Sequence, residues 1–212
     1  MATLPPTPGQ EWPEGVTPRY RLFRRTVLFI FRVLLGLCLH GEKRVPERGP
    51  LILAANHTRY LDPVFVCIAV PRRVQWMAKK EIFLPGLRRF FALLGAFPVD
   101  RGGGGRAALK NALKLLSEGW ALGIFPEGTH KQTGGERDAK SGVSMMAVRG
   151  RARVIPIHLG KVPTPLDRLR GECFHIHVGD PINIDNTLKS REAYKDAAEK
   201  VLTTIYSLPK KG

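Results

Sequence analysis

Two side chains, His57 and Asp62, have the types and the spacing to carry out a chemical step together. A carboxylate that binds one ring nitrogen fixes the tautomer of an imidazole and stabilises its protonated form, so the other nitrogen can act as a general base. On one continuous helix the two side chains would point well apart, because each residue advances by about 100°. A turn between them would let them meet, and we expect deprotonation of a hydroxyl. The alternative is a histidine that only satisfies a turn beside a capping aspartate.

The neighbouring residues predict such a turn. The apolar run Leu51–Ala55 predicts a buried strand that ends just before His57. Asp62 stands immediately before Pro63, and Asp followed by Pro is a favourable N-cap and first-turn pair for a helix. We therefore place His57 in a strand-to-helix turn and Asp62 at the start of the helix, as its N-cap.

Four short blocks, in this order along the chain, resemble motifs of the glycerolipid acyltransferases. The segment from His57 to Asp62 resembles the HX4D motif of that family, and three further blocks lie at residues 95–101, 125–129 and 154–157. Together they extend over roughly half of the sequence. Four ordered matches are far more specific than one, and they favour the catalytic interpretation of His57.

The resemblance implies a binding site for a phosphate-bearing acyl acceptor. Arg101 would bind the phosphate, because a guanidinium group presents a planar fork of donors to its oxygens. Glu127, with Gly128 and Thr129, would hold the acceptor hydroxyl or order a basic residue. Lys140 matches a Lys-x-Gly pattern of the family and is a candidate for a second phosphate contact.

One departure from the family pattern affects this phosphate site. Many members carry Arg and Ser after the threonine of the third block, whereas His130 and Lys131 stand here. Either Lys140 or His130 could supply the missing cation. The fourth block implies that Ile155 and Pro156 lie near the acyl-donor site, although most of these side chains would also serve as ordinary core.

The activity implied by the resemblance is acyl transfer at a membrane. The expected reaction moves a fatty acyl group from a thioester to the sn-2 hydroxyl of 1-acylglycerol-3-phosphate (lysophosphatidic acid), with His57 as general base and Asp62 as its partner. Acyl-CoA or acyl carrier protein (acyl-ACP) would be the co-substrate, and no other cofactor is expected. Glycerol-3-phosphate or another lysolipid remains an alternative acceptor. The rival classes are a hydrolase of the same fold and a non-catalytic basic module that binds nucleic acid or membrane.

The composition fits a basic globular domain. The chain has 212 residues, 43% of them hydrophobic, and a formal net charge of +16. This charge indicates anionic partners, such as phosphates, acidic proteins, nucleic acid or an anionic membrane surface, and does not distinguish among them. The family resemblance implies an anionic membrane surface rather than nucleic acid. Three basic pairs are candidates for steering the acyl donor, or form a solvated or lipid-facing surface: Arg72–Arg73, Lys79–Lys80 and Arg88–Arg89.

Neither the cysteines nor the histidines predict a metal site. The three cysteines have no C-x-x-C spacing, which argues against a disulfide framework or a cysteine zinc site. His175 and His177 should share one strand face and His158 precedes them, but no acidic cluster accompanies these histidines. We expect no metal, because a catalytic zinc site needs three placed ligands.

The domain boundaries follow from composition. Residues 1–19 predict a flexible arm, 20–40 an amphipathic helix and 41–212 the acyltransferase domain. Arg21, Arg25 and Arg32 fall on one side of this helix, and its other side carries Phe23, Val27, Ile30, Leu34 and Leu37. The uninterrupted apolar run 33–39 is much shorter than the ~20 residues of a spanning helix. We therefore expect a peripheral or monotopic helix at the cytoplasmic face of the cell membrane. The alternative is a helix packed on the core with its arginines in water.

Strands and helices alternate over the rest of the chain, which predicts an α/β domain with a mixed, largely parallel central sheet flanked by helices. The expected strands are 51–55, 74–78, 96–99, 120–125, 154–158 and 172–178. The expected helices are 64–69, 87–94, 106–118, 142–149 and 192–208.

Overall fold

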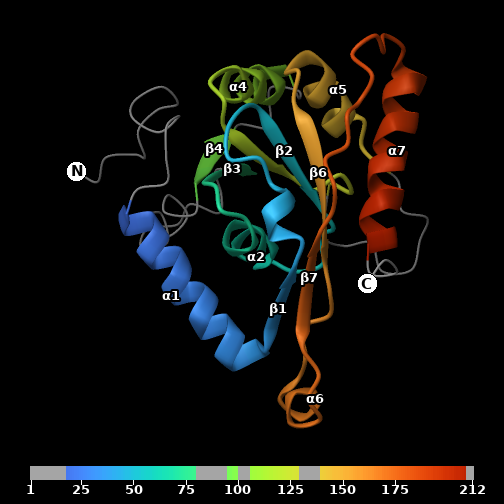
Figure 1. Ribbon diagram of the computed structural model, residues 1–212. Coiled ribbons are helices and arrows are strands. Elements are labelled where there is room, and N and C mark those ends of the chain that lie inside the picture. The colour runs from blue at the N-terminus through green and yellow to red at the C-terminus, as the bar shows by residue number, and fades with distance from the viewer. Residues whose placement is uncertain (1–17, 80–94, 100–105, 129–138, 209–212) are drawn as a thin grey trace.

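The computed structural model describes residues 18–79, 95–99, 106–128 and 139–208 (Figure 1). The helices are α1 (Pro18–Leu35), the short 3-10 helix η1 (Glu42–Arg44), α2 (Asp62–Ala69), α4 (Arg106–Ser117), α5 (Gly142–Arg149), α6 (Pro165–Leu169) and α7 (Arg191–Ser207). The strands are β1 (Leu37–His40), β2 (Leu51–Ala55), β3 (Val74–Lys79), β4 (Ala96–Val99), β5 (Ala121–Ile124), β6 (Arg153–Leu159) and β7 (Phe174–Val178).

The described strands form one sheet in the order β1-β7-β6-β2-β5-β3-β4. Neighbouring strands are parallel except for β6 and β7, which are antiparallel. The predicted fold class, a mixed and largely parallel sheet flanked by helices, is confirmed.

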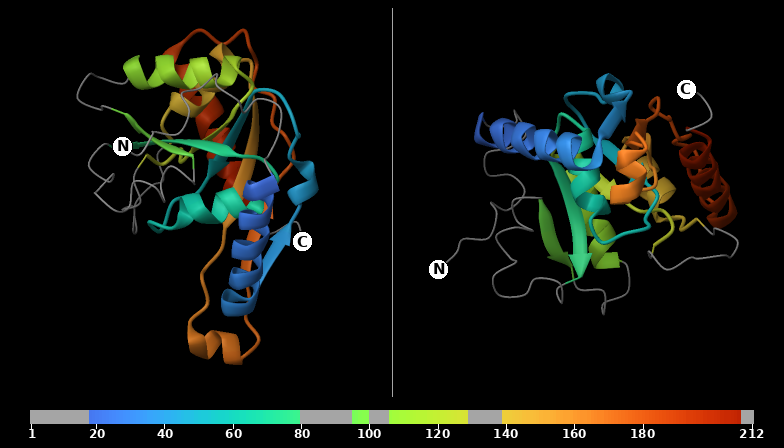
Figure 2. Two further views of the ribbon diagram at one scale, coloured as in Figure 1. Left: turned by 90° about the vertical axis from the view of Figure 1, so that its left-hand side faces the viewer. Right: turned by 90° about the horizontal axis from the view of Figure 1, so that it is seen from below.

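The sheet carries a hydrophobic core on each face. Helices α1 and α2 cover one face, and α4, α5 and α7 cover the other (Figures 1 and 2). The position of strand β2 explains its continuously apolar sequence. Leu51, Leu53 and Ala55 point into the core beneath α1 and α2, and Ile52 and Ala54 point into the core beneath α4, α5 and α7. A parallel strand that is buried on both faces has no polar side to alternate with.

The N-terminal helix is shorter than predicted. It ends at Leu35, and Gly36 follows in the left-handed region with φ of 59°. Glycine adopts this conformation without a steric penalty and commonly terminates helices. Residues 37–40, expected to continue the helix, form strand β1 beside β7. The predicted boundary at residue 40 is therefore wrong, because β1 belongs to the sheet.

Most of the other expected elements are found within one or two residues of their predicted ends. The expected helix 87–94 and the arm up to residue 17 lie outside the described residues, while Pro18 and Arg19 already belong to α1. Three small elements went unpredicted: β1, η1 and α6.

Arg72 has a structural role rather than the expected steering role. Its side chain is buried, and its guanidinium group donates to the carbonyl oxygens of Pro46, Gly49 and Gly119 at 3.1, 3.0 and 2.7 Å. These bonds join the loop before β2 to the turn before β5, so this guanidinium is occupied within the fold.

Candidate active site

The predicted catalytic pair lies where parallel strands end. Strand β2 ends at Ala55, two residues before His57, and its neighbour β5 ends at Ile124, just before Phe125. The carboxyl ends of parallel strands in open α/β sheets are where ligands bind. The polypeptide therefore brings His57 and Phe125 to the edge of the sheet at which chemistry is expected.

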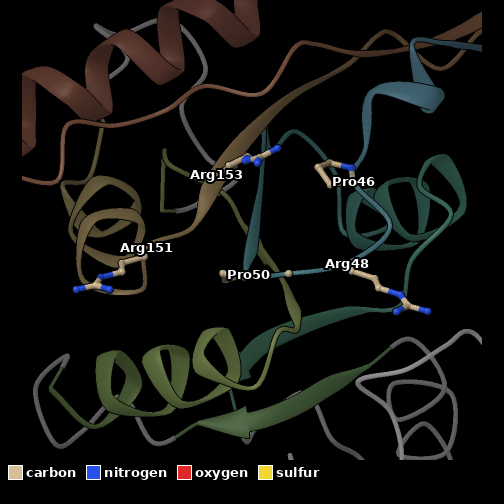
Figure 3. Close-up of a pocket in the computed structure, with 6 residues that line it drawn as sticks. Pro46, Arg48, Pro50, Arg151 and Arg153 are labelled. Atoms are coloured by element: carbon tan, nitrogen blue, oxygen red, sulfur yellow. The ribbon is translucent and has the colours of Figure 1, made fainter.

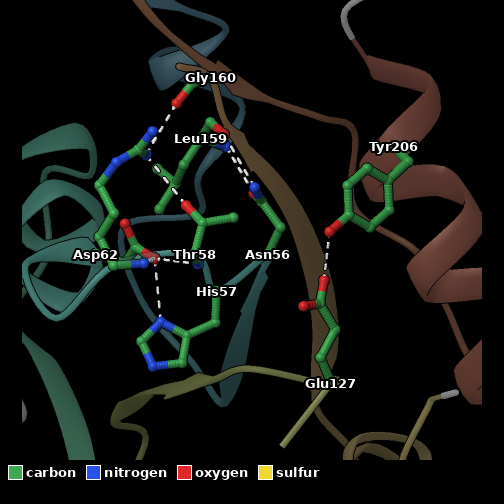
Figure 4. A network of polar contacts seen from close by, with 9 residues as sticks. Asn56, His57, Thr58, Asp62, Glu127, Leu159, Gly160 and Tyr206 are labelled. Atoms are coloured by element: carbon green, nitrogen blue, oxygen red, sulfur yellow. Dashed lines mark hydrogen bonds and ion pairs between the residues drawn. The ribbon is translucent and has the colours of Figure 1, made fainter. Parts of the chain in front are cut away.

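His57 and Asp62 meet as the spacing predicts. Nδ1 of His57 lies 3.0 Å from Oδ2 of Asp62. The Asp62 side chain is fully buried, whereas that of His57 remains 15% exposed. Figure 4 shows the imidazole with Nδ1 turned toward the carboxylate and its other nitrogen on the far side of the ring. This geometry holds the carboxylate out of water and leaves part of the imidazole exposed to solvent.

Asp62 performs this task from a different helix position than expected. It is the first residue of α2, and the cap position belongs to Leu61. Its Oδ2 atom accepts hydrogen bonds from the backbone N–H groups of Thr58 and Arg59 at 2.6 and 2.7 Å. The carboxylate thus closes the turn that precedes the helix, and the predicted N-cap role is wrong.

Asn56 fixes the position of this turn on the sheet. Its side-chain amide donates to the carbonyl of Leu159 at 2.9 Å, and the N–H of Leu159 donates back to Oδ1 at 2.7 Å. Asn56 is buried, and the two bonds clamp the end of β2 to the end of β6 directly before His57. The sequence alone did not reveal Asn56 as a site residue, because its partner lies 103 positions along the chain.

An aromatic stack supports the imidazole from the side. The His57 ring lies 3.9 Å from the Phe125 ring at an interplanar angle of 14°, and Trp76 stacks on Phe125 at 5.0 Å. Gly123 makes room for the indole, since a Cβ atom there would come within 2.5 Å of it. Trp76 also donates to Sγ of Cys67 at 3.2 Å. The stack restrains the ring orientation that the carboxylate sets, and neither Trp76 nor Gly123 was singled out from the sequence.

The third predicted block forms a compact turn. The N–H of Lys140 donates to the carbonyl of Pro126 at 2.8 Å, which brings Lys140 beside Gly128. Gly128 has φ of 78°, a conformation that favours glycine. Three of the predicted acceptor-site residues are therefore close together: Glu127, Gly128 and Lys140. The Lys140 side chain is exposed, as a phosphate ligand must be.

Glu127 has a partner that the sequence did not reveal. The hydroxyl of Tyr206 in α7 donates to its Oε1 atom at 2.5 Å, and the Glu127 side chain is buried (Figure 4). A buried carboxylate needs such a donor to offset its lost hydration. Helix α7 thus reaches the turn after β5 and holds the Glu127 carboxylate in one orientation.

Several predicted site residues remain untested. Arg101, Thr129 and His130 lie outside the described residues, so their phosphate-site roles stay predictions. Ile155 is fully buried in the core beneath α1 and α2. Pro156 pairs with Ala54 in the β2–β6 register. Their proximity to an acyl donor also stays a prediction.

A separate pocket lies at the other end of the strands. It is lined by Pro46, Arg48, Gly49, Pro50, Arg151 and Arg153. Arg153 pairs with Leu51 at the start of β2, opposite the end that carries His57. The guanidinium groups of Arg48 and Arg151 point away from each other (Figure 3). This pocket therefore lies away from the predicted catalytic pair, at the opposite end of β2.

Comparison with known proteins identifies the family that this chain resembles. Residues 36–160 match the profile of a family described as Acyltransferase. The chain is 30% identical over 166 residues to the 1-acyl-sn-glycerol-3-phosphate acyltransferase of Bacillus subtilis, covering 77% of this chain and 82% of that protein. It is 26% identical to the enzyme of the same name from Streptococcus pneumoniae, covering 92% of this chain and 75% of that protein.

A solved structure has the same fold. The crystal structure of the 1-acyl-sn-glycerophosphate acyltransferase PlsC from Thermotoga maritima matches with a TM-score of 0.62 at 19% identity, covering 93% of this chain and 86% of that one. The profile match includes the His57–Asp62 turn, the Phe125 turn and strand β6. The family that the four blocks predicted is thereby confirmed, and the chain belongs to the acyltransferases.

Proposed function

We propose that this acyltransferase moves a fatty acyl group from an acyl thioester to the sn-2 hydroxyl of a 1-acylglycerol-3-phosphate. The substrate class is supported by the names of the Bacillus and Streptococcus relatives. The catalytic role rests on one observation, the 3.0 Å contact between Nδ1 of His57 and the buried carboxylate of Asp62. An imidazole held in this way can remove a proton from an alcohol.

The proposed reaction proceeds by direct transfer. His57 takes the proton of the acceptor hydroxyl on Nε2 while Asp62 stabilises the resulting imidazolium. The hydroxyl oxygen attacks the thioester carbonyl, the carbon–sulfur bond breaks, and the proton passes from the imidazolium to the departing thiolate. Among the described cysteines, Cys67 lies near the site through Trp76, but burial raises the pKa of its thiol to about 12. A thiol that stays protonated is a poor nucleophile, so an acyl-enzyme through Cys67 is disfavoured.

The acceptor phosphate would bind beside the Pro126–Gly128 turn. Lys140 supplies an exposed ammonium group there, and Arg101 is the second cation predicted from the family resemblance. Acyl-CoA or acyl-ACP would serve as donor. Both carry phosphate groups, and the net charge of +16 favours the approach of either.

We further propose that α1 attaches the enzyme to a membrane surface. Leu22, Phe29 and Val33 are 68%, 68% and 60% exposed. They fall within about 40° on the helical wheel, opposite the side that packs on the core. Exposed arginines lie beside this apolar face: Arg21, Arg25 and Arg32. This arrangement is typical of helices that lie in the interface of an anionic bilayer.

The structure changes which apolar side chains of α1 are exposed and which pack on the core. Phe23 and Val27 of the expected membrane face are half-buried against the core, whereas Ile30 and Leu34 are exposed. The helix packs along one side of the domain (Figures 1 and 2). Its exposed apolar residues form a second apolar side that faces away from the core. Among the residues that the structure describes, no helix is both long and apolar enough to cross a bilayer.

A panel of donors and acceptors tests the function. Purified protein in detergent is assayed with acyl-CoA and acyl-ACP against lysophosphatidic acid, glycerol-3-phosphate, another lysophospholipid and buffer alone. We expect phosphatidic acid from the lysophosphatidic acid reaction. His57→Gln should lower kcat by about 10²–10⁴-fold, the usual contribution of a general base.

The outcomes separate the alternatives. Free fatty acid in the absence of acceptor would indicate a hydrolase, and a preference for another acceptor would change the substrate assignment alone. A His57→Gln protein that is folded by circular dichroism and fully active would exclude His57 as the base.

A further inference from the structure

Three histidines gather on one face of the ribbon formed by β1 and β7. The two strands are parallel, and their register pairs His40 with His177 and Cys38 with His175. Side chains two residues apart on a strand point to the same face, so His175 and His177 lie on one side of β7. His40 stands beside them on the neighbouring strand. Figure 1 shows this ribbon at the edge of the sheet, where β1 is the last strand.

The imidazole nitrogens of these residues are close enough to share one ligand. One nitrogen from each of His40, His175 and His177 lies within 4.8 Å of the other two. Nε2 of His40 is 3.0 Å from Nδ1 of His175, and the rings of His40 and His177 stack at 4.4 Å. His40 and His175 are exposed, and His177 is half-buried. The cluster is thus open to the solvent at His40 and His175, while His177 is partly held by its surroundings.

The geometry points to a binding site for a divalent transition metal, with His40, His175 and His177 as its three protein ligands. A tetrahedral ion bound at about 2.0–2.1 Å needs nitrogens about 3.3 Å apart. Nε2 of His40 and Nδ1 of His175 are 3.0 Å apart because they share a hydrogen bond, which a bound metal would replace. Rotation of these two exposed side chains would set the required spacing and bring the nitrogen of His177, now within 4.8 Å, closer. Imidazole suits Zn²⁺, Ni²⁺ and Cu²⁺, and an exposed fourth position would hold water.

The donor set consists of imidazole nitrogens. Within the described residues, the cluster of potential metal ligands contains His40, His175 and His177 and includes no cysteine. Imidazole nitrogens rather than thiolates are therefore the expected ligands. From the sequence no metal was expected, because no acidic cluster accompanies His158, His175 and His177 and a catalytic zinc site needs three placed ligands. The register of β1 and β7 adds His40 as a third imidazole beside His175 and His177.

A metal at this position would have a structural consequence. It would join β1, which directly follows α1, to β7, which lies 135 residues later at the His40–His175 contact. Binding to the folded state alone stabilises that state. We therefore expect the metal to fasten the N-terminal helix and strand to the sheet. This inference does not depend on the acyl-transfer reaction.

Calorimetric titration with Zn²⁺ and visible spectroscopy with Co²⁺ test the site. Untagged full-length protein is treated with a chelator, kept reduced and titrated together with His40→Gln, His175→Gln and His57→Gln. We expect one equivalent of Zn²⁺ to bind and to raise Tm. Each of the two cluster variants should weaken binding by about tenfold or more, since each removes one of three ligands. Co²⁺ should show the strong visible bands of a four-coordinate site.

The control variant separates the cluster from the catalytic pair. His57→Gln removes a histidine outside the cluster and should bind Zn²⁺ as the unchanged protein does. Absence of saturable binding, unchanged affinity in both cluster variants, or loss of binding in His57→Gln would each overturn the assignment. A thiolate-to-cobalt charge-transfer band would also overturn it, since it would place Cys38 or Cys173 on the metal. Because His40 and His175 are both exposed, the two variants provide independent tests in folded protein.

Discussion

At the scale of single residues, Asp62 combines two functions in one oxygen atom. Its Oδ2 atom accepts the N–H groups of Thr58 and Arg59 and also contacts Nδ1 of His57. The bonds to the backbone shape the turn, and the bond to the ring orients the base. The geometry of the turn and the orientation of the imidazole therefore depend on the same carboxylate.

Replacing this carboxylate by an amide should separate the two functions. Asp62→Asn keeps the size of the side chain and one oxygen, but it removes the charge that stabilises the imidazolium. We expect kcat to fall by about 10²–10⁴-fold, with a smaller change in KM for the acceptor. Steady-state kinetics, with circular dichroism to confirm folding, measure both. An unchanged kcat in folded protein would contradict the proposed role.

The Tyr206–Glu127 bond predicts a different kinetic effect. Tyr206→Phe removes the hydroxyl that donates to the buried Glu127. We expect a loss of about 1–3 kcal/mol of stability, the usual cost of a buried polar group without its partner. If Glu127 orders the acceptor site, KM for the acceptor should rise more than kcat falls.

A matched control lies in the same helix. Tyr194→Phe removes a hydroxyl that donates to the carbonyl of Leu188 at 2.9 Å, with no bond to Glu127. It should lower the stability without raising KM. Equal kinetics in the two variants would mean that the Tyr206–Glu127 bond serves only the fold.

Residue types and spacing predicted the contact between His57 and Asp62, because the two residues are close in the sequence. The same reasoning could not reveal Asn56 or Tyr206 as site residues. Asn56 contacts Leu159 only through the β2–β6 pairing, and Tyr206 reaches Glu127 only after α7 has packed on the sheet. Contacts of this kind depend on the register of distant elements.

At the scale of elements, the proposed attachment of α1 to a membrane can be tested by mutation. Replacing Leu22, Phe29 and Val33 together by serine should weaken binding to anionic phospholipid vesicles by about tenfold or more, since apolar burial contributes about 25 cal/mol per Å². The unfolding temperature should change little, because these side chains are exposed. Vesicle sedimentation at fixed salt measures membrane binding, and thermal unfolding measures the unfolding temperature.

Exposed leucines of another helix supply the control for α1. Leu166 and Leu169 of α6 are 56% and 86% exposed, and their replacement by serine should leave vesicle binding unchanged. Equal binding by the α1 variant and the unchanged protein would exclude α1 as the attachment helix.

The elements themselves were predictable to differing degrees. Strand β2 and helix α4 were found because apolar runs and helical periodicity are local signals. Strand β1 was missed because Leu37–His40 continues the apolar composition of α1, and only the φ of 59° at Gly36 separates the two. A glycine inside an apolar segment indicates such a break. It does not indicate that the following residues form a strand, nor which strand they pair with.

At the scale of the whole molecule, Arg72 shows how a buried cation stabilises the fold. Its three bonds to carbonyl oxygens connect the loop before β2 to the turn before β5. Arg72→Met should lower the free energy of unfolding by about 3 kcal/mol, because buried carbonyls would lose their donor. Arg48→Met, at an exposed position nearby, should cost less than about 0.5 kcal/mol.

Chemical denaturation of both arginine variants measures this difference. The folded Arg72→Met protein should keep its KM for acyl-CoA, since the guanidinium group is already occupied within the fold. A raised KM with unchanged stability would restore the donor-steering role that the sequence suggested.

The adjacency of β1 and β7 has a consequence for synthesis on the ribosome. Strand β1 is translated well before the strand that pairs with it, since His40 and His175 are 135 residues apart. Contacts between residues so distant in sequence slow folding, because a long loop must close before they form. Until β7 has been synthesised, β1 lacks its neighbouring strand, whereas α1 can already pack on α2.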